Sequence, residues 1–322
     1  MILTAIKALV ADDLRAVDTA IQHHLSSEIP LVGHISHHII LSGGKRLRPL
    51  LHLLSALAMG YRGTDHITLA AIIEFIHTAT LLHDDVVDES SQRRGYATAN
   101  TLFGNAASVL VGDFLYSRAF QLMASLKRLE VMDILSETTN TIAAGEVLQL
   151  SYRHQPNLTE AEYFKVIRCK TAALFQASTE LGAILTSPAP EIRVALATYG
   201  RNVGTAFQLM DDILDYEANP EDWGKNVGDD FKEGKMTLPL IYALQQVSSP
   251  QKQMIIQAIQ HPEGAFLEPL RDLIHSSGAL ALCRDKCCEY TECAGMALKP
   301  LPASAAKEAL WTLADSLVCR VT

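Results

Sequence analysis

Glycine and proline are sparse in this chain and form no tract. They number 18 and 12 of 322 residues, below the roughly 12% that the two types contribute on average, which excludes fibrous and linker proteins. Hydrophobic residues make up 48% of the chain and charged residues 20%, so intrinsic disorder is excluded as well. There is no shift in composition, no low-complexity segment and no repeat of about 30 to 45 residues. We therefore expect one compact domain over residues 1–322.

Positive charge is also scarce. Lysine and arginine number 27 against 36 aspartates and glutamates, which gives a net charge of -9. A protein that binds nucleic acid needs a basic surface to displace the counterions of the phosphates. No nucleic-acid partner is therefore expected, and an anionic ligand must meet cations that are concentrated locally.

Long apolar runs are missing too. The two longest, Leu50–Met59 and Leu69–Leu82, are interrupted by His52, Glu74 and His77. A membrane-spanning helix needs about 18 to 20 apolar residues without such interruptions, so no transmembrane helix is expected.

The first residues and the cysteines favour a cytoplasmic location. Met1–Val10 is followed at once by acidic residues and lacks the apolar core and cleavage site of a secretory signal. No Cys-x-x-Cys pair with matching histidines, the usual spacing of zinc ligands, is present. Reduced thiols are expected at Cys169, Cys283, Cys287, Cys288, Cys293 and Cys319.

Apolar residues recur with the period of a helix. In residues 69–87 they fall three and four positions apart, not in the alternation of a half-buried strand. Similar patterns, separated by short loops with glycine or proline, predict further helices over residues 105–126, 129–150, 160–186, 191–217, 237–260 and 303–319. The expected fold class is all-α, a single helical bundle.

Two acidic triplets with identical spacing interrupt these apolar helices. Residues four apart lie on one face of a helix, and like charges about 4 Å apart repel by roughly 4 kcal/mol at an effective dielectric near 20, so the carboxylates need cations. Mg²⁺ binds one or two carboxylates and leaves positions for water and phosphate. One such triplet is more often a solvated helix end, but two predict a site for Mg²⁺ and a diphosphate. The triplets are Asp84, Asp85 and Asp88, and Asp211, Asp212 and Asp215.

Basic segments accompany both triplets. Gly43–Pro49 places flexible backbone before three cations, and its proline suits the first turn of a helix, whose free N–H groups attract anions. Arg93 and Arg94 follow the first triplet, and lysines 225, 232 and 235 follow the second. Both signs of charge are needed around a metal-bound diphosphate.

The histidines allow two interpretations. His77 lies two helical turns before Asp84, where it can donate to a phosphate or be a core histidine, and both remain open. His34, His37 and His38 have the spacing of metal ligands on a helix but no further ligand nearby in sequence. A surface or core cluster is expected there.

Five motifs in a fixed order carry a family resemblance. They are Gly-Gly-Lys-Arg-Leu-Arg-Pro at 43–49, Leu-Leu-His-Asp-Asp-Val-Val-Asp at 81–88 with Arg-Arg-Gly after it, and Gln-Leu-Met-Asp-Asp-Ile-Leu-Asp at 208–215 with Gly-Lys and Glu-Gly-Lys after it. Over about residues 40–240 the chain resembles the trans-isoprenyl diphosphate synthases, and most of all their bacterial members that make octaprenyl diphosphate for ubiquinone. The resemblance implies a helical bundle around a deep central cavity, usually as a homodimer.

The resemblance also implies a role for each matched residue. The diphosphate of isopentenyl diphosphate would be bound by Lys45, Arg48, His77 and Arg94, and the allylic diphosphate by Arg93. Three Mg²⁺ ions would be bound by Asp84, Asp88 and Asp211, with support from Asp85, Asp212 and Asp215. The allylic cation would be flanked by Lys170 and Thr171, at a helix break, and by Gln208. The pyrophosphate clamp would be completed by Lys225 and Lys235.

The implied reaction is a chain-elongating prenyl transfer. Metal ions and cationic side chains neutralise the departing pyrophosphate, Gln208 and Thr171 stabilise the allylic carbocation, and the double bond of isopentenyl diphosphate attacks it. The departed pyrophosphate then removes the final proton. The lipid product implies a transient contact with membranes.

Product length is expected to depend on the helix of the first triplet. Thr80 and Ala79 lie four and five residues before Asp84, about one turn of 5.4 Å, where short-chain members of the family carry aromatic rings. Small residues leave the path of the growing chain open, so a product near octaprenyl length is expected. The residue that ends the path of the growing product is then expected to lie deeper in the protein. Met123 is the first candidate for it, followed by Phe120 and Leu135.

Other functions fit fewer of these residues. A shorter-chain synthase that makes farnesyl or geranylgeranyl diphosphate shares the motifs, whereas a silent subunit of a heteromeric synthase would lack acids from one triplet. A metal phosphohydrolase of the HD type would use His83 and Asp84 but leaves the second triplet unexplained. A class I terpene cyclase would not need Lys45, Arg48 and Arg94.

Overall fold

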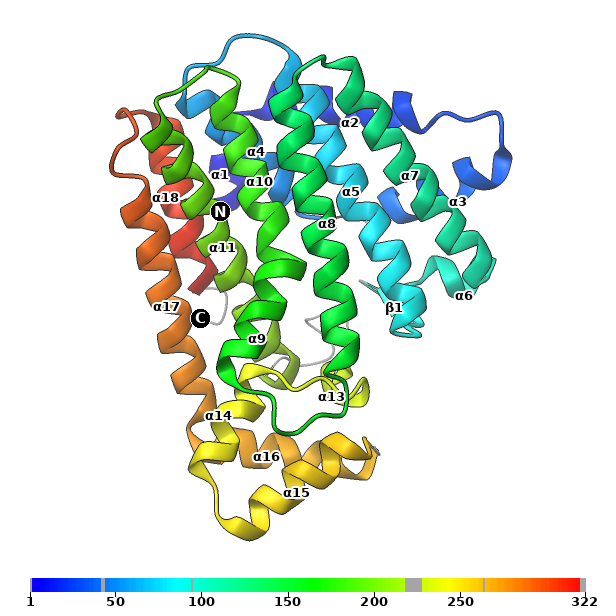
Figure 1. The fold of residues 1–322 in the computed structure, drawn as a ribbon, viewed down its shortest axis with the longest axis vertical. Helices are drawn as coiled ribbons and strands as arrows, with labels where there is room; N and C mark the ends of the chain where they lie inside the picture. Colours follow the sequence, from blue (N-terminus) through cyan, green and yellow to red (C-terminus); the bar gives the residue numbers. More distant parts are fainter. Residues whose placement is uncertain (1, 42–43, 94, 218–227, 263, 319–322) are drawn as a thin grey trace. The chain divides into compact units, whose positions relative to one another are not determined.

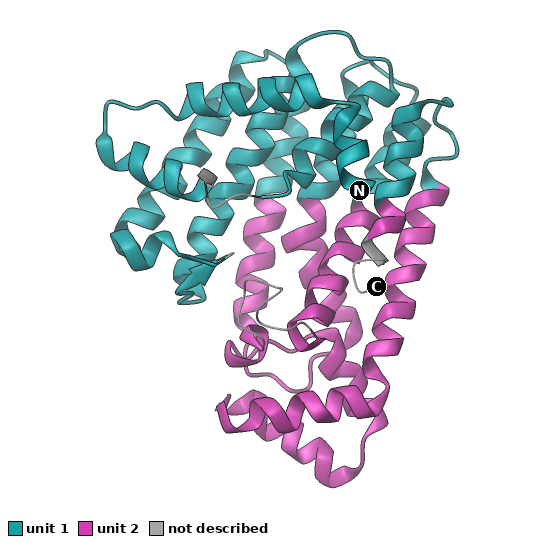
Figure 2. Ribbon diagram, turned by 180° about the vertical axis from the view of Figure 1, so that it is seen from behind, with its two compact units in different colours: residues 1–139, 174–200, 297–313 teal, residues 140–173, 201–296, 314–322 magenta. Residues whose placement is uncertain are grey.

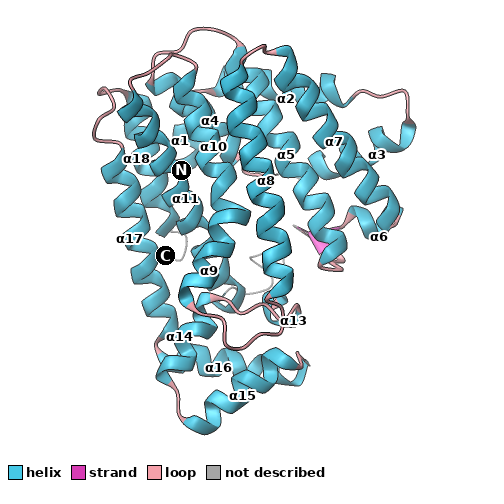
Figure 3. Ribbon diagram, viewed as in Figure 1, coloured by secondary structure: helices cyan, strands magenta, loops and turns pink. Residues whose placement is uncertain are grey.

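The computed structural model describes residues 2–41, 44–93, 95–217, 228–262 and 264–318. Apart from one two-stranded hairpin, the regular structure in these ranges is helical (Figures 1 and 3). The all-α fold class is thus confirmed. The chain divides into two compact units, which Figure 2 colours separately, and each is described by itself. The expectation of a single domain stays a prediction.

Unit 1 comprises residues 1–139, 174–200 and 297–313. Its helices and strands are α1 (Ile2–Ala8), α2 (Ala11–Leu25), α3 (Pro30–Leu41), α4 (Leu47–Ala58), α5 (Asp65–Val87), β1 (Gln92–Arg93), β2 (Tyr96–Ala97), α6 (Ala99–Phe103), α7 (Asn105–Ser125), most of α10 (Ala173–Ile184), most of α18 (Ala305–Val318), and the first parts of α8 (Leu129–Ser151) and α11 (Pro190–Glu217).

Helix α5 forms the core of unit 1. It packs against α7, α4 and α2, and apolar residues on nearly all its faces are buried, which is the pattern of a core helix. Among the described helices it alone is long and apolar enough to cross a membrane, but 61% of its most apolar window is buried inside the protein. The burial is that of a helix in a folded core.

The end of α5 positions the first acidic triplet. The helix ends at Val87, and the backbone N–H of Asp88 still donates to the carbonyl of Asp84 at 2.8 Å. The chain then turns through Glu89, at a left-handed φ of 51°, into the β1–β2 hairpin. His38 lies 2.8 Å from the carbonyl oxygen of Ala97 in β2 through its Nε2 atom. This histidine therefore anchors the hairpin, in agreement with the expected structural cluster.

Unit 2 comprises residues 140–173, 201–296 and 314–322. It contains the remaining parts of α8, α11 and α18, together with α9 (Glu160–Ile167), the π-helix η1 (Arg168–Ala172), α13 (Asp229–Lys232), α14 (Leu238–Gln246), α15 (Ser249–Gln260), the short η2 (Gly264–Phe266), α16 (Leu267–Ser277) and α17 (Ala279–Ala297). The described cysteines, Cys169, Cys283, Cys287, Cys288 and Cys293, are free thiols.

Most of the predicted helices are confirmed within a few residues, and one is wrong. The pattern over 237–260 predicted one helix, but the chain forms α14 and α15 with a break at Val247 and Ser248. The break has a local cause, because Ser248 and Gln251 form a reciprocal capping box and Pro250 suits only a first helical turn. The pattern over 160–186 is interrupted by η1, where the resemblance implied a helix break.

Candidate functional site

The first acidic triplet presents two of its carboxylates together. Asp84 and Asp88 are half-buried and lie one turn apart, so both are on one face of the end of α5. Asp85 is 1% exposed and lies on a different face. A pair of acids with a third turned away is what the spacing of this triplet predicted.

Asp85 holds Arg93 of the hairpin. The Nε and Nη2 atoms of Arg93 donate to one carboxylate oxygen of Asp85 at 2.9 and 2.7 Å. Burial raises the pKa of Asp85, and the charge of Arg93 opposes this rise. Burial lowers the pKa of Arg93, but the charge and hydrogen bonds of Asp85, together with the charges of Asp84 and Asp88, raise it above its usual value. The arginine assigned to the allylic diphosphate is thus fixed by an acid of the triplet.

Arg48 and His77 come together beside the start of α4. Nη1 of Arg48 lies 3.2 Å from Nε2 of His77, and the guanidinium stacks 4.4 Å from the centre of the Phe175 ring. His77 is thus half-buried beside a cation. Lys45 is exposed. Arg94 lies outside the described residues.

Arg46, which lies between those cations in the sequence, has a different partner. It forms an ion pair with the buried Glu74 of α5, and its Nε lies 3.7 Å from Asp18. The backbone of Arg46 has a left-handed φ of 50° just before α4. We conclude that Arg46 joins α4 to α5, while Lys45 and Arg48 are the cations assigned to a ligand.

The second triplet lies in the C-terminal part of α11. Asp211 is half-buried, whereas Asp212 and Asp215 are 3% and 6% exposed. The backbone N–H of Asp230 donates to a carboxylate oxygen of Asp215 at 3.3 Å, and that of Gly228 donates to the carbonyl of Asp215 at 3.0 Å. Asp215 therefore fixes the turn that follows, where α13 begins.

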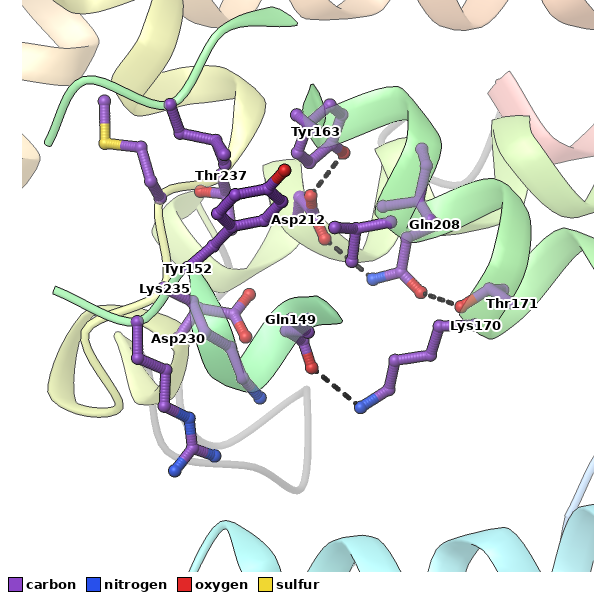
Figure 4. Close-up of a pocket in the computed structure, with 15 residues that line it drawn as sticks. Gln149, Tyr152, Tyr163, Lys170, Thr171, Gln208, Asp212, Asp230, Lys235 and Thr237 are labelled. Atoms are coloured by element: carbon purple, nitrogen blue, oxygen red, sulfur yellow. Dashed lines mark hydrogen bonds between the residues drawn. The ribbon is translucent and has the colours of Figure 1, made fainter. Parts of the chain in front are cut away.

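A pocket in unit 2 brings five predicted residues together (Figure 4). They come from η1, α11 and the turn after α13, and are Lys170, Thr171, Gln208, Asp212 and Lys235. Tyr163, Arg153 and Asp230 also line the pocket, and the sequence analysis missed all three. Lys225 lies outside the described residues.

The π-helix η1 places Lys170 and Thr171 in this pocket. A π-helix inserts a residue into the helical repeat and is common at functional sites. Nζ of Lys170 donates to Glu146 at 2.6 Å and to Gln149 at 2.8 Å, both on α8. The backbone of η1 lies so close to α8 that a Cβ atom on Gly145 would be 2.8 Å from Cβ of Cys169 and 2.9 Å from N of Lys170. Only glycine fits that position without a shift.

Three hydrogen bonds join four side chains of the pocket. Thr171 donates to Oε1 of Gln208 at 2.7 Å, Nε2 of Gln208 donates to Asp212 at 2.8 Å, and the phenol of Tyr163 donates to the other oxygen of Asp212 at 2.5 Å (Figure 4). Burial and then the charge of Asp230 raise the pKa of Asp212 to about 8. A divalent cation or a hydrogen-bond donor beside this carboxylate would stabilise its charged form.

Lys235 follows a glycine that packs against the loop after α8. Gly234 has a left-handed φ of 69°, and a Cβ atom there would lie 2.3 Å from Nδ1 of His154. The backbone N–H of His154 donates to the carbonyl of Gly234 at 2.9 Å, while its ring Nδ1 is 3.1 Å from the carbonyl oxygen of Ile259. Lys235 itself forms an ion pair with Glu233.

The residues assigned to product length are mostly core residues of unit 1. Ala79, Met123 and Leu135 are fully buried, and the half-buried Thr80 donates to the carbonyl of His77 at 2.7 Å. Phe120 is 38% exposed in the single chain, and its role at the end of the path of the growing product stays a prediction.

The donor set suits a magnesium ion that shares its coordination with a phosphate. Within the described residues no group of three histidines, cysteines or acids could hold a metal alone. Each unit instead offers one or two carboxylates at the surface of a helix, Asp84 with Asp88 and Asp211. Mg²⁺ is commonly bound in this way, with substrate phosphates and water completing the octahedron.

The chain is similar to known proteins over nearly its full length. Residues 29–268 match the Polyprenyl synthetase family. The chain is 50% identical to an octaprenyl diphosphate synthase of Escherichia coli, with 99% of each chain covered, and 45% identical to an all-trans-nonaprenyl-diphosphate synthase of Rhodobacter capsulatus, with 98% and 97% covered.

A solved structure is similar in the same way. It is a polyprenyl synthase from Caulobacter crescentus complexed with calcium and isoprenyl diphosphate, with a TM-score of 0.96, 42% identity, and 99% and 98% of the two chains covered. Family match, full-length identity and fold agree with one another and with the motifs. The chain belongs to the polyprenyl synthetase family.

Proposed function

We propose that this chain is a Mg²⁺-dependent prenyltransferase that adds isopentenyl diphosphate repeatedly to an allylic diphosphate such as farnesyl diphosphate. The product is a long all-trans polyprenyl diphosphate, of octaprenyl length, for the side chain of ubiquinone. The observation that carries this proposal is the 50% identity to an octaprenyl diphosphate synthase over 99% of both chains.

The cations of unit 1 support the binding of isopentenyl diphosphate. Arg48 is held by the Phe175 ring and lies beside His77, so its positive charge has a defined position. Lys45 precedes α4 and adds a second positive charge. Arg94 follows Arg93, which Asp85 holds for the allylic diphosphate.

The pocket of unit 2 supports the stabilisation of an allylic cation. The oxygens of Thr171 and Gln208 carry partial negative charge and are fixed by hydrogen bonds, so little reorganisation is needed when positive charge develops. Lys170 and Lys235 line the same pocket and would bind the departing pyrophosphate, with Lys225. Mg²⁺ would supply charge neutralisation of that leaving group, with Asp211 as the ligand offered by this unit and Asp84 and Asp88 as those offered by unit 1.

The direct test is a condensation assay. The protein is incubated with Mg²⁺, farnesyl diphosphate and labelled isopentenyl diphosphate, and the products are separated by chain length. Octaprenyl diphosphate is the expected main product. Products of only farnesyl or geranylgeranyl length would support the shorter-chain alternative, and absence of any condensation would refute the proposed activity.

The length assignment has its own test. Ala79→Tyr places a ring at a fully buried position about one turn before Asp84 and should shorten the product to farnesyl or geranylgeranyl length, whereas Ala79→Ser should not. Met123→Ala should lengthen the product. A folded Ala79→Tyr variant that still makes the full-length product would show that the growing isoprenoid product does not pass along this helix. Thr80→Phe, at a half-buried position, repeats the test if Ala79→Tyr does not fold.

A homodimer is part of the proposal. Helix α7 exposes apolar side chains at Val109, Leu110 and Phe120, which a second copy would cover. Leu110→Glu should then convert the dimer to a monomer in light scattering. A cytoplasmic location accords with the free thiols, and the lipid product would bring the protein into transient contact with membranes.

A further inference from the structure

Tyr163 is the end of the hydrogen-bonded chain in the pocket of unit 2. Its phenol donates to Oδ2 of Asp212 at 2.5 Å, while the other oxygen of Asp212 accepts from Gln208 at 2.8 Å. Gln208 in turn accepts from Thr171 at 2.7 Å. Each amide and carboxylate atom of the chain thus has one defined partner (Figure 4).

This series of hydrogen bonds fixes which atoms of Gln208 and Thr171 face the reacting substrate. Because Nε2 of Gln208 donates to Asp212, its Oε1 is the atom turned to Thr171. Because the hydroxyl proton of Thr171 is directed to Gln208, the lone pairs of that hydroxyl are left for a positive charge. An amide that flipped would turn N–H groups toward Thr171, which opposes cation stabilisation.

Tyr163 is held in place independently of its hydroxyl. It lies in the first turn of α9, which begins with a capping box between Thr159 and Glu162. Its ring is 3% exposed and packs edge-on against Phe164 with the centroids 5.3 Å apart. Burial, followed by the charge of Asp212, raises the pKa of Tyr163 well above its usual value, so the phenol stays a donor.

We propose that Tyr163 is a positioning residue that acts through Asp212 to fix the orientation of Gln208 and Thr171 at the allylic cation. The inference rests on the proposed function for the identity of that cation. Without the phenol, Asp212 loses the donor to Oδ2 and can rotate, which releases the amide of Gln208. The loss should affect the chemical step and not the binding of isopentenyl diphosphate.

Tyr163→Phe removes the hydroxyl and keeps the ring. Tyr199→Phe is the matched control, since Tyr199 is also fully buried on α11 and its hydroxyl donates to the carbonyl of Leu310 at 2.6 Å, in unit 1. We expect kcat of Tyr163→Phe to fall about tenfold or more, with KM for isopentenyl diphosphate within about twofold of wild type. Tyr199→Phe should lower the melting temperature to a similar extent but leave kcat unchanged.

The double variant Tyr163→Phe/Gln208→Ala separates positioning from a structural role. If Tyr163 acts through Gln208, the double variant should have the kcat of Gln208→Ala alone. The proposal is overturned if the kcat losses of the two single variants multiply in the double variant. It is also overturned if Tyr163→Phe has the same kcat as Tyr199→Phe, or if Tyr163→Phe is the only one of these two variants that unfolds.

A second measurement distinguishes failure of this inference from failure of the proposed function. If wild-type protein does not condense isoprenyl substrates, the proposed function fails, and the link between Tyr163 and Asp212 is tested by thermal unfolding of Tyr163→Phe, Asp212→Asn and the double variant Tyr163→Phe/Asp212→Asn. A double variant that is no less stable than the less stable of the two single variants supports the link. Additive losses of stability refute it.

Discussion

Gly145 offers a sharp test of whether the position of η1 sets the rate. In Gly145→Ala the new Cβ would lie 2.8 Å from Cβ of Cys169 and 2.9 Å from N of Lys170. Ordinary van der Waals contact begins at 3.4 Å, so η1 and α8 must separate by about 0.6 Å. The atoms that move are the backbone of Lys170 and, next to it, Thr171.

The expected result is a slower enzyme with nearly unchanged stability. A displacement of about 1 Å near the reacting atoms can cost about 10²-fold in rate, so a shift of about 0.6 Å should lower kcat about tenfold. Alanine in a helix is favoured over glycine by about 1 kcal/mol, which offsets part of the strain. Steady-state assays with labelled isopentenyl diphosphate give kcat, and thermal unfolding gives stability.

Gly33→Ala is the matched control. Gly33 lies within α3, and an added Cβ there meets no atom within 4 Å. This variant should keep the kcat of wild type. If folded Gly145→Ala also keeps kcat within about twofold, the rate does not depend on the placement of η1, and the reasoning fails.

Three further predictions concern the metal, the substrates and acidity. Activity should require Mg²⁺, and Asp84→Ala or Asp211→Ala should remove most of it without unfolding; full turnover in both variants would refute the metal assignment. Lys45→Ala should mainly raise KM for isopentenyl diphosphate and Arg93→Ala that for the allylic substrate, and equal effects on both would refute this division. Burial lowers the pKa of His52 to about 4, so between pH 6.5 and 4 the unfolded chain binds a proton that the folded chain does not. The free energy of unfolding, measured by urea titration, should therefore fall by about 2 kcal/mol from pH 7 to pH 5 through this residue. If the free energy of unfolding of His52→Gln depends on pH as steeply as that of wild type, the assignment is contradicted.

Local features of the sequence predicted what depends on neighbours along the chain. The period of the apolar residues predicted α5, α7, α8 and α11, and the spacing of the first triplet predicted that Asp84 and Asp88 share a face. In the second triplet Asp215 is buried and fixes the following turn instead. The break between α14 and α15 was also readable, because Ser248, Pro250 and Gln251 are typical of a helix start. The period of the apolar residues over 237–260 does not by itself reveal this break.

Partners that are distant in the sequence could not be predicted. Tyr163 is one aromatic residue on a partly apolar helix, and its contact with Asp212, 49 residues away, arises from tertiary packing. For the same reason nothing local distinguished Arg46, which Glu74 holds, from Lys45 and Arg48. The exposure of Phe120 depends on which face of α7 packs against α5.

The contact between Gly234 and His154 limits how sequences of this family can be recombined. A residue other than glycine at 234 would collide with the His154 ring, and His154 itself has a left-handed φ of 60°, a conformation that β-branched residues strongly disfavour. In a chimera whose parents both keep this glycine, the loop after α8 can be exchanged only for one whose residue at position 154 tolerates a left-handed φ. A β-branched residue there would strain the loop that the hydrogen bond from the backbone of His154 to the carbonyl of Gly234 joins to the segment of Lys235.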